Sequence, residues 1–277
     1  MAYDVAIVGA TGAVGQEFLT VLAERKFPIK SLKLLASSRS AGKTVTWQGK
    51  PYTIEELTKD SFKGIQIAFF SAGGSISKEF APAAVSAGAV VIDNTSAFRR
   101  KEGVPLVVPE VNPEQIAKHN GLIANPNCST IIMNVPVWPL YKANRIKRII
   151  VSTYQAVSGA GAWGMYELEE QMKAMVAGKP IQKQKFPHQI ANNLFSHNSA
   201  IADNGYNEEE NKMINETRKI FGDAKIMVTA TCVRVPIMRA HSESINLEFE
   251  RPITPQQVRE ILAKAPGVTI VDDPKTN

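Results

Sequence analysis

The first half of the chain alternates short apolar runs with stretches that have a helical period. The β-like runs lie at residues 3–8, 32–36, 65–70, 89–93, 106–108 and 122–124. Helical patterns follow the first and third of these runs, one reaching about Arg25 and one covering residues 75–87. Strands that alternate with helices indicate a parallel sheet with helices on both faces. The pattern predicts an N-terminal α/β domain over residues 1–127.

The pattern changes in the second half, where we expect residues 128–277 to form an α+β domain with a mixed or antiparallel sheet. Helices are predicted at residues 165–176, 208–221 and 254–265, and strands at residues 148–155, 226–235, 242–249 and 268–271. The strands at 226–235 and 242–249 alternate partially, which suggests an antiparallel pair with one covered face. Residues 178–205 are polar without a clear period, and loops of this length are usually functional or lie against another subunit. The loop and the one-faced sheet together suggest a homodimer.

Composition narrows the class of protein. The chain has 277 residues, of which 44% are hydrophobic and 21% charged, as in soluble globular proteins. It has no run of about 18 apolar residues, so we expect no membrane partner. Two cysteines, Cys128 and Cys232, make neither a disulfide framework nor a metal pattern, which favours a reducing, cytoplasmic setting. The net charge of +6 has no Lys/Arg block and fits an anionic cofactor or substrate, so no nucleic-acid partner is expected.

A glycine-rich turn follows the first strand. Gly9, Gly12 and Gly15 lie between this strand and the first helix, which is where a pyrophosphate binds at a helix N-terminus. A tight turn that binds nothing would use the same glycines. We predict a Rossmann-like domain that holds a dinucleotide through the following residues: Gly9, Thr11, Gly12, Ala13, Val14 and Gly15.

The loop after the second strand indicates which dinucleotide binds. An NAD-binding chain places an acidic residue near here to hold the ribose 2′-hydroxyl. This loop has Ser37, Ser38 and Arg39 instead, which suit a 2′-phosphate, although a solvated loop can have the same composition. We therefore predict NADP as the cofactor. Small residues that leave room for it follow a later strand, at Ser71, Ala72 and Gly73.

The segment Asn125–Thr130 contains the candidate nucleophile. Cys128 lies between an apolar β-like run and a stretch that can begin a helix, and Pro126 stiffens the turn. A helix N-terminus lowers the pKa of a thiol, and its N–H groups could also hold an oxyanion. A buried structural cysteine is the alternative. Pro136 and Pro139 should kink or end this helix.

A dinucleotide fold with a nucleophilic thiol suggests the oxidation of an aldehyde. The thiolate adds to the carbonyl carbon, a hydride leaves to the nicotinamide, and a thioester remains. The candidate base is His241, because imidazole titrates near neutral pH, although single histidines are often structural. Arg234 lies seven residues earlier and could hold a carboxylate in the same pocket by two parallel hydrogen bonds.

Over essentially its whole length the sequence resembles aspartate-β-semialdehyde dehydrogenase. The resemblance rests on residues 8–15, 71–74, 93–96, 109–112, 125–130, 154–161 and 234–241. The cysteine segment followed by Gln155-Ala-Val-Ser-Gly-Ala-Gly161 is highly specific. The resemblance implies NADP-dependent interconversion of aspartate semialdehyde and β-aspartyl phosphate, with inorganic phosphate as a substrate, on the route to lysine, threonine and methionine. It also implies a homodimer.

The resemblance implies roles for the matched residues. Cys128 is the nucleophile, His241 the general acid/base, and Gln155 orients the acyl intermediate. The substrate residues are Arg234 for the carboxylate, Glu209 for the amino group, Arg99 and Lys212 for the phosphate, and Asn127 in support. Glu209 and Lys212 are three apart and share a face if they lie on one helix. The cofactor site gains Ser158, Gly159, Ala160 and Gly161.

Members of this family usually continue past the position of Asn277 and return to the first domain, so we expect this chain to be a fragment. Two other functions fit part of the pattern. One is a related acyl-phosphate reductase, such as an N-acetyl-glutamyl-phosphate reductase, against which the pairing of Arg234 with Glu209 argues. The other is a non-catalytic NADP-binding redox sensor with Cys128 as the sensing thiol. The glycine turn disfavours a cysteine hydrolase.

Overall fold

The computed structural model describes residues 2–273 and 275, and the chain forms two compact units. The first unit comprises residues 1–107 and 114–126, and the second comprises residues 108–113 and 127–277. Residues 1, 274, 276 and 277, which the predicted domains include, lie outside the described residues. No described helix is long and apolar enough to cross a membrane.

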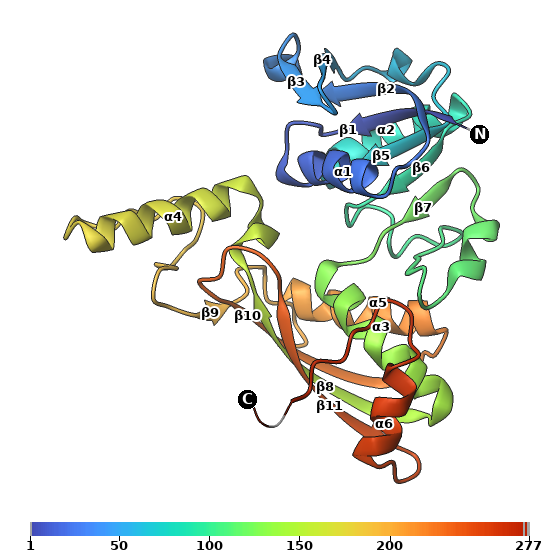
Figure 1. The fold of residues 1–277 in the computed structure, drawn as a ribbon, viewed down its shortest axis with the longest axis vertical. Coiled ribbons are helices and arrows are strands. Elements are labelled where there is room, and N and C mark those ends of the chain that lie inside the picture. The colour runs from blue at the N-terminus through green and yellow to red at the C-terminus, as the bar shows by residue number, and fades with distance from the viewer. Residues whose placement is uncertain (1, 274, 276–277) are drawn as a thin grey trace. The chain divides into compact units, whose positions relative to one another are not determined.

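The first unit is built on a seven-stranded sheet in the order β3-β4-β2-β1-β5-β6-β7 (Figure 1). The strands are β1 (Tyr3–Val8), β2 (Ile29–Ala36), β3 (Thr44–Trp47), β4 (Lys50–Glu56), β5 (Ile67–Phe70), β6 (Val90–Asp93) and β7 (Leu122–Ala124). Neighbouring strands pair in parallel except β3 and β4, an antiparallel hairpin that the sequence analysis missed. The helices α1 (Ala13–Glu24) and α2 (Gly74–Ser86) follow β1 and β5. The predicted Rossmann-like α/β fold is confirmed.

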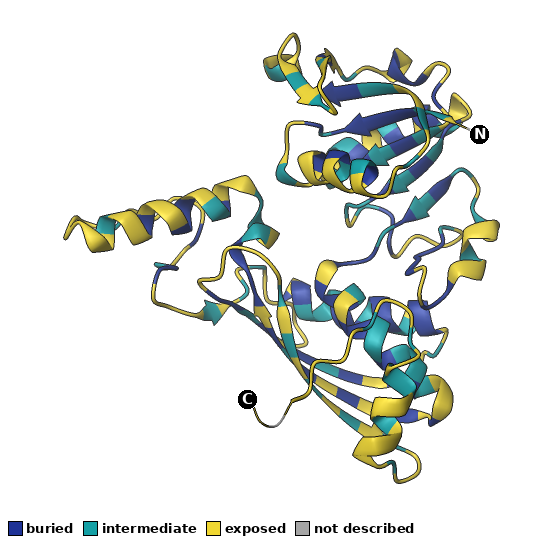
Figure 2. Ribbon diagram, viewed as in Figure 1, coloured by how far each residue is buried: buried dark blue, intermediate teal, exposed yellow. Residues whose placement is uncertain are grey.

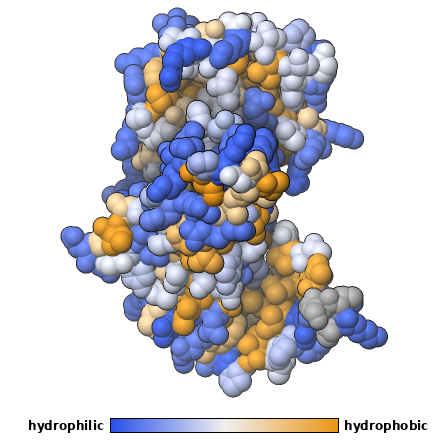
Figure 3. Space-filling view, turned by 90° about the vertical axis from the view of Figure 1, so that its left-hand side faces the viewer, coloured by the Kyte–Doolittle hydropathy of each residue, from blue (hydrophilic) through white to orange (hydrophobic). Residues whose placement is uncertain are grey.

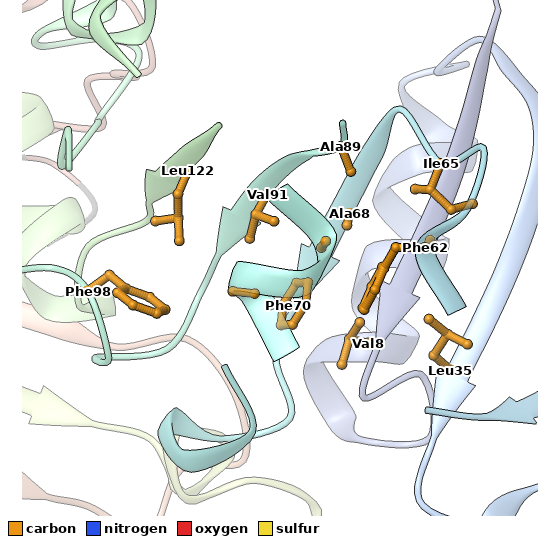
Figure 4. Packing of buried hydrophobic residues seen from close by; sticks show 13 residues of the cluster. Val8, Leu35, Phe62, Ile65, Ala68, Phe70, Ala89, Val91, Phe98 and Leu122 are labelled. Carbon is orange, nitrogen blue, oxygen red and sulfur yellow. The ribbon is translucent and has the colours of Figure 1, made fainter. Parts of the chain in front are cut away.

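The core of this unit explains why its strands are continuous apolar runs. Side chains from neighbouring strands, such as Val8, Phe70 and Val91, are fully buried and meet those of the connecting segments (Figure 4). Phe62 stacks on Phe70 with 5.7 Å between ring centroids. Strands buried on both faces need apolar side chains at every position, so they lack alternation.

The second unit contains a four-stranded sheet in the order β11-β8-β10-β9. The strands are β8 (Ile146–Gln155), β9 (Phe195–Ser196), β10 (Met227–Arg234) and β11 (Ser242–Phe249), and the helices are α3 (Cys128–Ala143), α4 (Ala162–Val176), α5 (Glu208–Phe221) and α6 (Pro255–Leu262). β10 is parallel to β8, whereas β9 and β11 run antiparallel to their neighbours. The sheet is therefore mixed, as predicted.

One face of this sheet is covered and the other is open (Figure 2). In β8 the buried residues Ile149 and Val151 alternate with the exposed residues Ile150 and Tyr154. The helices α3 and α5 pack on the covered face, against β8 and β10. Period-two alternation is the expected pattern for a sheet with one buried face.

The predicted antiparallel pairing of residues 226–235 with 242–249 is wrong. Both strands form, but β8 lies between them and pairs with each. Partial alternation indicates that a strand has one covered face, and it contains no information about which strand lies next to it. β8 is long and rich in β-branched residues, and it pairs with β10 along one edge and with β11 along the other.

Three smaller expectations also differ from the structure. Of the two effects expected of Pro136 and Pro139, a kink or an end of the helix, the end does not occur, because both residues lie inside α3, which continues to Ala143. The predicted strand at residues 106–108 is reduced to a single bridge between Leu106 and Ala124. Residues 268–271 form no strand, and the Val271 side chain is exposed.

Candidate active site

Cys128 is the first residue of α3, as predicted, and is exposed. The N-cap residue Asn127 has extended backbone angles, and its side-chain Oδ1 accepts hydrogen bonds from the N–H groups of Ser129 (3.0 Å) and Thr130 (3.2 Å). This cap fixes the start of the helix and therefore the position of the thiol. It also corrects the expectation that these amides could hold an oxyanion, because they already donate to Asn127.

Two buried glutamates hold Asn127 in turn. Its backbone N–H donates to Glu216 Oε2 at 2.6 Å, and its side-chain Nδ2 donates to Glu209 Oε1 at 2.7 Å. Both carboxylates come from α5, so this helix positions the residue that caps α3. The start of α3 is thus anchored at the backbone and at the side chain.

The other predicted catalytic residues lie where three strands meet. Gln155 ends β8, Arg234 ends β10, and the two are paired across the parallel ladder. β11 is antiparallel to β8 and begins at Ser242, opposite Tyr154. His241, which precedes β11, therefore lies at the same end of the sheet as Gln155 and Arg234. The topology of the sheet brings together residues that are far apart in the sequence.

Gln155 joins this edge to α3 and α5. It is 1% exposed, and its Nε2 donates to Ser129 Oγ and to Glu209 Oε1, the latter at 3.2 Å. Its Oε1 atom is buried and has no hydrogen-bond partner among the described residues. An acceptor in this position has room for a donor from a bound ligand.

Glu209 is the carboxylate on which this network converges. Burial by itself would raise the pKa of Glu209, but electrostatic interactions with His197 and Lys212 and the hydrogen bonds from Asn127 and Gln155 lower the pKa below its usual value. Lys212 Nζ lies 3.3 Å from Glu209 Oε2, which confirms that the two share a face of α5. Glu209 is therefore a charged, buried acceptor.

Arg234 is the most buried cation of the site, with 2% exposure. Its Nη1 donates to the carbonyl of Ala156 at 2.7 Å, and its guanidinium carbon lies 5.9 Å from the centre of the Phe186 ring. Burial lowers the pKa of Arg234, while the negative charges of Glu209 and Cys128 act in the opposite direction. Its Nε atom is buried without a partner in the part of the chain that the structure describes, so it can donate to a bound anion.

His241 is held by its Nδ1 atom, which accepts a hydrogen bond from the N–H of Ala156 at 3.0 Å. Burial and the charge of Arg234 lower the pKa of His241, while Glu209 acts against them. The neutral ring therefore carries its proton on Nε2. A Cβ atom at Gly159 would lie 3.0 Å from Arg234 Nη1 and 3.2 Å from His241 Nε2, so both side chains meet at this glycine.

The glycine turn of the first unit forms a cradle made of backbone. Gly9 has φ +89°, and a Cβ there would lie 3.0 Å from the backbone of Ser71 and Ala72. A Cβ at Gly15 would lie 2.2 Å from the carbonyl oxygen of Gly9. The N-cap of α1, Gly12, offers no side-chain hydrogen bond, and the first turn has no acidic residue. These features fit a dinucleotide pyrophosphate at the start of α1.

The remaining predicted site residues lie in both units. Ser37, Ser38 and Arg39 are exposed directly after β2, where Ser38–Ser40 form a short 3-10 helix. Arg99 belongs to the first unit, where its Nη2 donates to the carbonyl of Asn94. The predicted cofactor residues 158–161 belong to the second unit, and Gly159 among them lies beside Arg234 and His241. Among the described residues no cluster of His, Cys, Asp and Glu could hold a metal ion.

Several residues of this network were not predicted from the sequence. His197 follows β9 and interacts electrostatically with Glu209, and burial lowers its pKa to about 4. Ser129 and Glu216 hold Gln155 and Asn127, and Phe186 lies under Arg234. A histidine and a phenylalanine within a long aperiodic segment were signals that this loop joins the site. No local pattern indicated Glu216.

Two family models match the chain. Residues 4–119 match the semialdehyde dehydrogenase NAD-binding domain, and residues 137–277 match the semialdehyde dehydrogenase dimerisation domain. The first match supports a nicotinamide dinucleotide as the cofactor, and the second supports assembly of two copies. Together the models cover most of the chain and both units.

Relatives and solved structures agree with these models. The chain is 57% identical to an aspartate-semialdehyde dehydrogenase of Aquifex aeolicus, over 100% of this chain and 83% of that protein. It superimposes with a TM-score of 0.94 and 49% identity on aspartate semialdehyde dehydrogenase II from Vibrio cholerae complexed with ASA, covering 96% of this chain and 80% of that one. With a TM-score of 0.74 and 26% identity it resembles the Candida albicans enzyme with NADP, over 95% and 76% of the two chains.

Proposed function

The chain belongs to the aspartate-semialdehyde dehydrogenase family, and we propose that its Cys128 site interconverts aspartate semialdehyde and β-aspartyl phosphate through a thioester. One observation supports these residue roles. Asn127, which precedes Cys128, donates a hydrogen bond to Glu209, and Glu209 also accepts one from Gln155. Gln155 is paired with Arg234 at the ends of β8 and β10. A thiolate, a carboxylate-binding cation and an ammonium-binding carboxylate match an amino acid with an aldehyde in its side chain.

Substrate binding follows from Arg234 and Glu209. Arg234 has one nitrogen committed to Ala156 and a buried Nε that lacks a partner among the described residues, so it can hold the α-carboxylate. Glu209 stays ionised because His197, Lys212, Asn127 and Gln155 offset the effect of its burial, and it accepts from the α-ammonium. These two contacts fix both polar ends of a small substrate and direct its aldehyde carbon to the thiol.

The chemistry needs little proton transfer once Cys128 is a thiolate. The helix dipole of α3 favours the thiolate, which adds to the aldehyde carbon and leaves its oxygen as an oxyanion. His241 donates to this oxygen from Nε2, because its Nδ1 is occupied by the N–H of Ala156. A bound nicotinamide dinucleotide supplies the hydride acceptor, and the acyl group remains on Cys128 as a thioester that phosphate attacks.

We propose NADP rather than NAD as that dinucleotide. The cradle at Gly9–Gly15 fits either form, and the exposed Ser37, Ser38 and Arg39 suit a 2′-phosphate. Arg99 and Lys212 are proposed to bind the inorganic phosphate. The Candida albicans relative with NADP supports the choice of cofactor.

The proposal is tested by following reduction of NADP with aspartate semialdehyde, with and without phosphate. We expect turnover only when phosphate is present, because the thioester otherwise has no acceptor other than water. A non-catalytic redox sensor would bind NADP without this phosphate-dependent reduction. A substrate panel that favours an N-acetylated glutamate semialdehyde would assign the site to a related acyl-phosphate reductase.

We further propose that a second copy of the chain covers the open face of the second sheet. The residues Ile150, Tyr154 and Met227 are exposed on this face, and apolar side chains gather on the second unit in Figure 3. The match to a dimerisation domain over residues 137–277 supports a homodimer through this unit. Light scattering at micromolar concentration should give the mass of a dimer, and a monomer would contradict the proposal.

A further inference from the structure

We propose that Phe186, in the long aperiodic segment, is a positioning residue that sets the orientation of the Arg234 guanidinium and thereby the affinity for the substrate's carboxylate. The inference rests on the proposed role of Arg234. The Phe186 side chain is 3% exposed, and its ring lies 5.9 Å from the guanidinium carbon of Arg234. A desolvated cation over an aromatic face is attracted by the quadrupole of the ring.

The guanidinium is thus fixed on two sides. The carbonyl of Ala156 accepts from Nη1, and the ring of Phe186 lies against the guanidinium. The plane that remains is the one in which Arg234 can form a bidentate pair with a carboxylate. Loss of the ring would leave the guanidinium with one fixed contact and would give it more freedom to rotate.

The backbone next to Phe186 is fastened to α4 by a buried carboxylate. Glu167 is 3% exposed, and its Oε2 accepts hydrogen bonds from the N–H groups of Lys185 and Phe186, the second at 3.2 Å. Gln171 Nε2 donates to the other carboxylate oxygen at 2.9 Å. The position of the ring is therefore set by a specific polar contact and not by apolar packing alone.

Gln171, one turn further along α4, fastens the rest of the segment. Its Oε1 accepts from the N–H groups of Ile190 (2.9 Å) and Ala191 (3.1 Å), and its Nε2 also donates to the carbonyl of Gln182 (3.0 Å). Gln171 is 1% exposed. Two side chains of one helix thus hold a loop that has no regular hydrogen-bonding pattern of its own.

The packing around the ring leaves little space for a different arrangement. A Cβ atom at Gly164 would lie 3.2 Å from Phe186 Cζ and 2.6 Å from the carbonyl oxygen of Val157. Phe186 also belongs to a buried cluster with Val157 and Leu168. The segment therefore presents one ring, in one place, to the cation that is proposed to bind substrate.

The test is a double-mutant cycle in kcat/KM for aspartate semialdehyde, using Phe186→Leu and Arg234→Gln. We expect Phe186→Leu to lower kcat/KM by about 10-fold, through a higher KM with kcat within about twofold. In the Arg234→Gln background the same exchange should change kcat/KM by less than about twofold, because the cation that Phe186 orients is gone. Phe186→Met, which fills the space with a flexible apolar chain, is measured alongside and should behave like Phe186→Leu.

The matched control is Leu168→Ala, which removes packing from the same buried cluster. It should lower the thermal midpoint and leave KM unchanged. Equal effects of Phe186→Leu in both backgrounds would overturn the inference and make Phe186 a structural residue. If Arg234→Gln itself leaves KM unchanged, the proposed carboxylate site fails; if Arg234→Gln raises KM but Phe186→Leu does not, only the positioning role fails.

Discussion

The two helix N-termini of the candidate sites differ in what occupies their N–H groups. α1 begins after Gly12, which provides no side-chain cap, whereas α3 begins after Asn127, whose side chain accepts from the amides of Ser129 and Thr130. The open N-terminus suits an anion that arrives from outside, the pyrophosphate of a dinucleotide. At the capped N-terminus the amides of Ser129 and Thr130 are satisfied by the protein, so this helix start presents the thiol of Cys128 and leaves the recognition of charge to other residues.

This difference separates a site made of backbone from a site made of side chains. The cradle of the first unit needs only a strand, three glycines and a helix, all within residues 3–24. The site of the second unit needs side chains from α3, α5 and three strand ends, held by hydrogen bonds that span up to 89 residues. A single substitution in the second site therefore removes a function that no neighbour can replace.

The largest expected effect concerns Cys128. Cys128→Ser should lower kcat by at least about 10³-fold while the protein stays folded, because an alcohol at this helix start is not ionised. Steady-state NADP reduction measures the loss, and circular dichroism checks the fold.

The control is Cys232→Ser. Cys232 is buried in β10, where burial raises its pKa to about 12, and its Sγ lies 3.7 Å from Met213 Sδ. Cys232→Ser should lower the free energy of unfolding and leave kcat nearly unchanged. Alkylation should likewise modify Cys128 first. Equal losses of turnover from the two exchanges would contradict the assignment of the nucleophile.

The next effect concerns Arg234, on which substrate binding is proposed to depend. Arg234→Lys should lower kcat/KM by roughly 10²–10³, about 3–4 kcal/mol, because lysine lacks the fork that holds a carboxylate and the misplaced aldehyde also reacts more slowly. The cradle of the first unit should keep its affinity for NADP in this variant. If KM and kcat are both unchanged, Arg234 is a structural residue at the end of β10.

A third prediction concerns how the stability of the second unit depends on pH. Burial lowers the pKa of His197 to about 4 from 6.5, and the charged groups around it are Glu209, Arg234, Lys212 and Glu208. The unfolded chain binds the proton more tightly, so the stability that the neutral ring provides is present above about pH 6.5 and is lost as the pH falls towards 4. The gap between the two pKa values corresponds to about 3 kcal/mol.

His197→Gln isolates this contribution. The free energy of unfolding of the wild-type protein should fall by about 3 kcal/mol relative to that of the variant between pH 7 and pH 4, as measured by urea denaturation. The same measurement on the exposed His188→Gln is the matched control for the removal of an imidazole. Parallel curves for the wild-type protein and His197→Gln would show that His197 titrates normally.

The elements that the sequence predicted well carry local signals. Helix α5 has the ends that the sequence predicted, Glu208 and Phe221, and the structure shows local features at both: Asn207 and Glu210 form a capping box, and Gly222 ends the helix with φ +65°. The strand, turn and helix at the start of the chain are equally local. The sequence also indicated Cys128 at a helix start, since Pro126 and the following apolar run are its neighbours.

What the sequence could not indicate depends on distant partners. In the sheet β8 lies between β10 and β11. This order depends on which strand has a free edge, and the residues of β10 alone do not indicate its neighbour. The attachment of Phe186 to Glu167 joins a loop to a helix 19 residues away. The capping of α3 by Asn127 was a local possibility, but its effect on the oxyanion expectation became visible only with the hydrogen bonds of Ser129 and Thr130 in place.

The smallest expected effect concerns Arg39 and tests whether the first site is made of backbone alone. The glycine cradle contacts the pyrophosphate, which NAD and NADP share, so it cannot distinguish them. Discrimination must come from side chains near the ribose, and the candidates are Ser37, Ser38 and Arg39, all exposed after β2. Arg39→Ala should weaken NADP binding by roughly 10–100-fold, the value of one charge-assisted contact of about 1.5–3 kcal/mol, and should leave NAD binding unchanged.

Fluorescence titration of both dinucleotides measures these affinities, with Lys63→Ala as the control for a general loss of positive charge. Lys63 is an exposed lysine of the same unit that pairs with Asp60 across 3.0 Å, so its removal changes the net charge by the same amount at another place. Because the field of a surface charge is screened within about 10 Å at moderate salt, Lys63→Ala should affect both dinucleotides equally and weakly. A wild-type protein that binds NAD more tightly than NADP would refute the role of this loop, and the cradle would then be the whole of the first site.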